Sequence, residues 1–74
     1  MKPTFKEKAI QAAIAKITAV KDDPNLSEAD KERLRNLKEA DICRSVSATY
    51  ISKLLKPADI RYIASQAVKI FSQI

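Results

Sequence analysis

The 74-residue sequence contains no glycine, no histidine, no tryptophan and only one cysteine, Cys43. Phosphate-binding loops and EF-hand loops need glycine at sharp backbone turns, so the missing glycine argues against both. With no histidine and one cysteine, the chain lacks the ligands of a structural zinc site and cannot form an internal disulfide. A lone cysteine without a disulfide framework is typical of a reducing, cytoplasmic setting.

The chain is also short and has no long apolar run. Its length suffices for one domain, 1–74, which would bury only about 60% of the surface that the unfolded chain exposes. The N-terminal stretch MKPTFKEKAI carries charges where a signal peptide needs an apolar core, and no run approaches the roughly 20 apolar residues of a membrane span. We therefore expect a soluble cytoplasmic domain without membrane contact.

Groups suited to catalysis are scarce. Without histidine, the most common general base is missing. Ser52 lies one helical turn from Lys56, but a solvated lysine with a pKa of about 10.4 is protonated at neutral pH and cannot activate a hydroxyl. The acids between residues 22 and 32 are explained by helix termination and capping. We expect neither an enzyme nor a bound metal or cofactor.

The charge is distributed unevenly along the chain. Residues 1–21 carry +4, residues 22–41 carry −3 and residues 42–74 carry +4, which makes the net charge +5. Two basic ends around an acidic middle fit either a nucleic-acid surface or a self-complementary assembly. A lysine-rich small protein can also carry such charge for solubility alone.

Apolar residues recur at steps of three and four, which predicts an all-α bundle of four or five helices. The first helix starts at a capping box formed by Thr4 and Glu7 and ends before Pro24. After Ser27, the apolar phase drifts. This drift favours two short helices over 27–35 and 37–44, with a single bent helix as the alternative.

The last third of the chain predicts two more helices. Ser47 would cap one over 47–56, with Ile51, Leu54 and Leu55 facing inward. Pro57 suits the first turn of the next, which carries a wide apolar stripe. Cys43 is expected to be a small core residue.

The stretch SVSATYISKLL, Ser45 to Leu55, resembles the recognition-helix half of bacterial helix-turn-helix DNA-binding proteins. Ser45 takes the position of the turn glycine, Val46 the apolar turn position and Ser47 the N-cap. Ile51 and Leu54 take the core positions. The first half of the motif departs from the pattern, because Asp41 and Arg44 stand where small or apolar residues are usual.

The resemblance implies a helix-turn-helix-like fold, in which the first turn of the 47–56 helix faces the major groove of duplex DNA. It also implies a small transcriptional or recombination accessory factor of the phage or plasmid type. The residues expected to contact DNA, through base edges, phosphates or added positive charge, are Arg44, Ser47, Thr49, Ser52, Lys53, Lys56 and Arg61. The alternative is that this helix has no DNA-binding role and is a core helix that Ser47 caps.

Another hypothesis is a protein-interaction module that forms a homodimer or binds a larger partner, with no nucleic-acid role. The apolar stripe of the last helix spans more than half its circumference, so part of it could remain exposed and bind a partner. The residues expected at this interface are Ile63, Ile70, Phe71 and Ile74. Single-strand or RNA binding has few aromatic residues to support it, with Tyr50 and Tyr62 as the stacking candidates outside the core.

Overall fold

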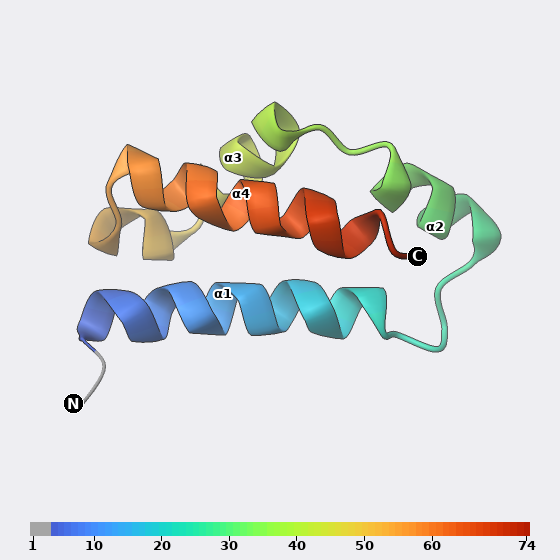
Figure 1. Cartoon of the computed structure of the whole chain (residues 1–74), viewed down its shortest axis with the longest axis horizontal. Helices are drawn as coiled ribbons and strands as arrows, with labels where there is room; N and C mark the ends of the chain where they lie inside the picture. Colours follow the sequence, from blue (N-terminus) through green and yellow to red (C-terminus); the bar gives the residue numbers. More distant parts are fainter. Residues whose placement is uncertain (1–3) are drawn as a thin grey trace.

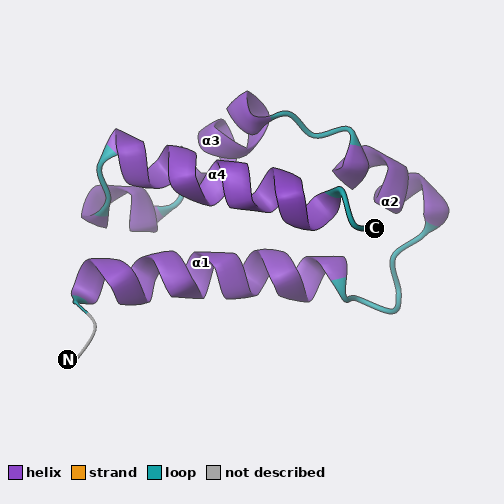
Figure 2. Ribbon diagram, viewed as in Figure 1, coloured by secondary structure: helices purple, strands orange, loops and turns teal. Residues whose placement is uncertain are grey.

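The structure, a computed structural model, describes residues 4–74 except the side chain of Ile51. Helices make up every regular element and no strand occurs in this range, so the predicted all-α class is confirmed (Figure 1, Figure 2). In chain order, the elements are α1 Phe5–Lys21, α2 Glu28–Arg35, α3 Glu39–Ser47, the short 3-10 helix η1 Tyr50–Leu54 and α4 Pro57–Phe71.

Helix α4 is the centre of the arrangement. It packs against α1 along one side and against α3 along another, and α2 touches it more thinly near the C-terminus (Figure 1). The Arg35 guanidinium donates a hydrogen bond to the carbonyl of Ile74 at 3.5 Å, which joins α2 to the end of the chain. The fold therefore depends on two helix pairs that share α4.

The core forms on the inward side of α4 as two adjoining clusters. The first cluster comprises Ile42, Ala64, Ala67 and Phe71. The second comprises Ala13, Leu55 and Ile63. The small side chains of Ala64 and Ala67 let neighbouring helices approach closely, and Ile63 is the largest side chain that is fully buried. Cys43, expected in the core, is partly buried and packs against the first cluster.

The predicted starts of the first and last helices are confirmed. Thr4 Oγ1 accepts a hydrogen bond from the Glu7 amide at 3.2 Å, and the Glu7 carboxylate accepts one from the Thr4 amide at 3.3 Å. These reciprocal bonds satisfy two amides that have no partner within the helix. Pro57 occupies the first turn of α4, where its missing amide hydrogen costs nothing.

The middle of the chain forms two helices rather than one bent helix. Ser27 caps α2 by accepting a hydrogen bond from the Asp30 amide at 3.1 Å. Helix α3 starts two residues later than predicted and continues to Ser47, beyond the expected end at residue 44. Its first turn is closed by the Asp41 carboxylate, which accepts from the Lys38 amide at 3.3 Å.

The prediction of an α-helix over 47–56 is wrong. Ser45 and Val46 lie inside α3, Ser47 is its last residue, and only the five-residue η1 follows. A helix-turn-helix turn often uses a left-handed residue, and no residue described here has a positive φ. Because the chain has no glycine to adopt that conformation cheaply, α3 continues through the segment expected to turn.

Hydroxyl groups then end α3 and shape η1. Thr49 Oγ1 donates to the Val46 carbonyl at 2.6 Å, and Ser52 Oγ donates to the carbonyls of Ser47 and Thr49 at 3.0 and 2.8 Å. Serine and threonine side chains that bond to nearby carbonyls compete with the helical ladder. Pro57 disfavours helical geometry at Lys56, so the segment cannot run straight into α4.

Of the two leucines that were predicted to face inward, only one is buried. Leu55 is buried, as predicted, but Leu54 is largely exposed, so its predicted core position is wrong. The predicted inward position of Ile51 concerns a side chain outside the described part of the chain.

Candidate nucleic-acid interface

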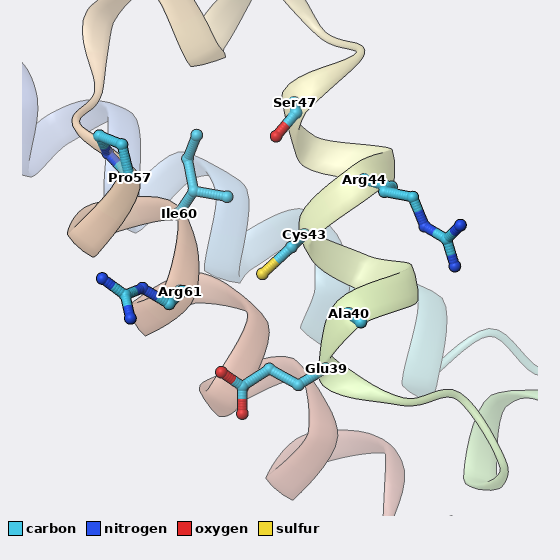
Figure 3. Close-up of a pocket in the computed structure, with 8 residues that line it drawn as sticks. All are labelled: Glu39, Ala40, Cys43, Arg44, Ser47, Pro57, Ile60 and Arg61. Atoms are coloured by element: carbon cyan, nitrogen blue, oxygen red, sulfur yellow. The ribbon is translucent and has the colours of Figure 1, made fainter.

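A groove between α3 and the start of α4 gathers three of the residues expected to contact DNA. Arg44 and Ser47 approach it from α3 and Arg61 approaches it from α4, while Cys43 and Ile60 form part of its apolar floor (Figure 3). The groove has a volume of about 610 Å³. The sequence segments that carry these residues are therefore neighbours in space.

The two arginines of this groove do not act together. Figure 3 shows their side chains directed away from each other, Arg44 away from α4 and Arg61 away from α3. The Arg44 guanidinium lies 2.7 Å from Asp41 Oδ1 and forms an exposed ion pair within its own helix. The Lys38 amide and this guanidinium hold the pKa of the Asp41 carboxyl below its usual range. Arg44 is therefore a weaker phosphate ligand than the sequence suggests.

The hydroxyl groups of Thr49 and Ser52 form hydrogen bonds with backbone carbonyls. Their hydrogens are donated to carbonyl oxygens at the end of α3. A phosphate oxygen can only accept a hydrogen bond, so neither hydroxyl can serve it without first giving up its local bond. That Thr49 and Ser52 contact DNA therefore stays a prediction, and a contact with phosphate would cost each hydroxyl its local hydrogen bond.

Four exposed cations lie on η1, at the N-cap of α4 and on the outward side of α4. We call this set of side chains, Lys53, Lys56, Arg61 and Lys69, the cationic face. None of them takes part in an ion pair within residues 4–74. Arg61 and Lys69 are eight residues apart, which places them about 12 Å apart along the helix axis. Lys69 is absent from the sequence-based set, although its position two turns after Arg61 could have indicated it.

The only acid of α4 is directed away from this face. Asp59 Oδ2 lies 3.1 Å from the Nζ of Lys6 on α1, and the Asp59 side chain is only 16% exposed. Asp59 also accepts a hydrogen bond from the Lys56 amide at 3.0 Å. That bond first, and then Lys6, lower the pKa of the Asp59 carboxyl below its usual range. Its carboxylate is thus paired with a lysine of α1, and no acidic residue of α4 lies on the outward side of that helix.

The predicted partner interface needs correction. Ile63 is 0% exposed and Phe71 is buried, so both belong to the core of this chain and are not on its surface. Ile70 and Ile74 are partly buried and pack against the first core cluster. The stripe on α4 is wide because it serves α1 and α3 together, which a single helix cannot reveal. The apolar surface of α4 is therefore mostly covered within one chain.

Exposed apolar surface lies instead between α1 and α3. Both helices pack on α4, and two hollows that share Ile17, Ser45 and Val46 run between them as one α1–α3 groove. Val20 and Tyr50 border this groove and are both exposed. Neither was expected to form a partner surface.

Other kinds of site find no support in the described residues. Residues 4–74 bring together no group of histidine, cysteine and acidic side chains that could hold a metal ion. Across the same residues, no helix has the length and apolar character needed to cross a membrane. Comparison of the chain with protein-family models, curated proteins and solved structures finds no match. A function must therefore be inferred from the residues themselves.

Proposed function

We propose that this chain binds nucleic acid by holding its phosphate backbone on the cationic face. The observation that carries the proposal is that Lys53, Lys56, Arg61 and Lys69 are exposed and make no ion pair within residues 4–74, while Asp59, the acid of α4, pairs with Lys6 on α1. The net charge of +5 points to the same class of polyanionic ligand. Duplex DNA, expected from the sequence, is a suitable first ligand, but it would be bound without a recognition helix over 47–56.

Phosphate binding by lysine and arginine gains free energy because condensed counterions leave the nucleic acid. Each phosphate that the protein neutralises contributes about 0.7 to 0.9 to the slope of log affinity against log salt. Four contacts therefore predict a slope of about −3. Since the phosphate backbone is the same in every sequence, we expect little discrimination between sequences.

The test is a binding titration with mixed-sequence duplex DNA at several salt concentrations. Arg61→Ala and Lys69→Ala should each weaken binding and reduce the salt slope by about one. Lys16→Ala is the matched control, because Lys16 is an exposed lysine on α1 outside the cationic face and makes no ion pair within residues 4–74. If all three variants weaken binding equally, the binding depends on the net charge of the chain and not on the cationic face. No effect of Arg61→Ala and Lys69→Ala would overturn the proposal.

A protein-interaction role is the second candidate, supported by the exposed apolar α1–α3 groove. The occupant we propose is a second copy of this chain. Lysines of α1, including Lys16 in the groove, could then face the acidic segment 22–41 of that copy. Charges of opposite sign in one chain favour such a self-complementary assembly.

Sedimentation at micromolar concentration tests the second candidate. We expect a dimer that Val20→Asp dissociates, because Val20 is an exposed apolar residue of the α1–α3 groove. Ala12→Asp is the control, since Ala12 is exposed on the same helix and does not line the groove. A wild-type chain that stays monomeric at high concentration would contradict self-association.

A further inference from the structure

An uncovered aromatic ring lies on the cationic face. Tyr62 follows Arg61 in α4 and is 51% exposed. Ala58 lies one turn before it and Ser65 one turn after it on the same side of the helix. Ser65 Oγ donates to the Tyr62 carbonyl at 3.0 Å, so the serine side chain folds back against the helix. Both neighbours are small, and half of the tyrosine surface, 51%, remains exposed to solvent.

Tyr62 has no visible structural task. It belongs to neither core cluster, and its hydroxyl makes no hydrogen bond to another described side chain or backbone group. Tyr50 provides the contrast, since it is 75% exposed but lines the α1–α3 groove beside Lys16 instead. Tyr62 is thus the aromatic residue that shares the outward side of α4 with Arg61 and Lys69.

We infer that Tyr62 stacks against an unpaired base, so that the cationic face takes single-stranded nucleic acid in preference to duplex. This inference rests on the proposed function and names its ligand class. Bases in a duplex are stacked on one another and present only their edges, so an exposed ring gains little from them. In a single strand every base has a free π-face, and an aromatic ring among cations holds base and backbone together.

In this arrangement a single tyrosine is enough to hold a base, because the neighbouring cations hold the phosphates. Arg61 adjoins the ring in sequence, and Lys69 lies two turns further along the same side of α4. A strand that crosses this side can place phosphates at both cations and one base over the ring between them. Stacking of this kind tolerates any base, so the preference for single strands carries no preference for sequence.

The experiment compares the affinities of the full chain for three ligands of equal length: oligothymidine, a mixed-sequence duplex and an abasic single strand. Tyr62→Ala should weaken binding to oligothymidine by between about fivefold and 150-fold, the range that loss of one stacked base predicts. Affinities for the duplex and the abasic strand should stay within about twofold, since neither offers a free base. Tyr62→Phe should restore oligothymidine binding, because it retains the ring.

Matched controls separate the two proposals. Tyr50→Ala removes an exposed tyrosine from the α1–α3 groove and should leave oligothymidine binding unchanged. If Tyr62→Ala has no effect on oligothymidine while Arg61→Ala and Lys69→Ala still weaken binding, the stacking inference fails and the proposed function stands. If neither the cations nor Tyr62 matter, both fail. Circular dichroism of each variant checks that the helices are intact.

Discussion

On the inward side of α4, Ile63 and Phe71 are enclosed by neighbouring helices, whereas on the outward side Arg61, Tyr62 and Lys69 project into solvent. The inward side is constrained by volume, since each buried group must fill space without strain. The outward side has no packing to satisfy. Its residues therefore serve either solubility or the binding of a ligand. Whether their charges are paired locally indicates which of these two roles they have.

Helix α2 shows what a charged surface looks like when its charges are balanced locally. Lys31 pairs with Glu28 at 3.3 Å and Arg33 pairs with Asp30 at 3.5 Å, each one turn apart. Such exposed pairs contribute little to stability, but they leave no net field. The outward side of α4 has cations and no such partners, which is why we assign the ligand to α4.

The largest expected effect on stability comes from truncating a buried side chain on the inward side of α4. Ile63→Ala should lower the free energy of unfolding by about 2–5 kcal/mol, because it leaves a cavity around a fully buried side chain. That is a large part of the stability of a domain this small. Tyr62→Ala should change the same quantity by less than about 0.5 kcal/mol, as expected for a solvated side chain. Urea denaturation followed by circular dichroism measures both, and equal losses would contradict the distinction between the two sides of α4.

A smaller loss of stability is expected at low pH, where Asp59 becomes protonated. The pKa of Asp59 is lowered in the folded chain, so the folded state binds fewer protons than the unfolded state near that pKa. The resulting stability is fully present above the unfolded value of about 3.9 and is lost as the pH falls through the folded pKa. Asp41 behaves in the same way on α3.

Denaturation midpoints measured from neutral to acidic pH test this linkage. Asp59→Asn should flatten the loss of stability on acidification, and adding Asp41→Asn should flatten it further. Glu32→Gln is a control for removal of a surface carboxylate that takes part in neither contact. A pH profile that the Asp59 and Asp41 changes leave unaltered would show that these carboxylates gain nothing from their folded environment.

The smallest effect concerns the one acid of α3 that reaches toward α4. Glu39 lines the groove opposite Arg61, and Figure 3 shows its carboxylate extending from α3 toward α4. Removing a negative charge near the proposed nucleic-acid site lowers repulsion, so Glu39→Gln should raise nucleic-acid affinity by about twofold. Glu28→Gln, on distant α2, should leave affinity unchanged at the same salt concentration. A decrease with Glu39→Gln would place the ligand elsewhere.

Local patterns determined much of this protein. The capping box of Thr4 and Glu7, Pro57 in a first turn and the three-and-four spacing of apolar residues all act within one or two helical turns. Such interactions are visible in the sequence because the residues that make them are close along the chain. The all-α class, the extent of α1 and the start of α4 follow from them.

The segment after α3 shows where local patterns fail. SVSATYISKLL has residues compatible with an α-helix, but Thr49 and Ser52 bond to carbonyls of α3, and Leu55 rather than Leu54 enters the core. The similarity to a recognition helix concerns residue types alone. It does not include the left-handed turn that a glycine would supply.

Tertiary structure decided which charges remain free. Lys6 and Asp59 are separated by more than fifty residues in the sequence, and only the packing of α1 on α4 brings them to 3.1 Å. The same packing encloses Ile63, which from the sequence could equally have faced a partner. Composition determined that the chain is basic, but charge pairing depends on distances through space. For this physical reason, only the fold could show that Arg61 and Lys69 remain without an ion pair on the outward side of α4.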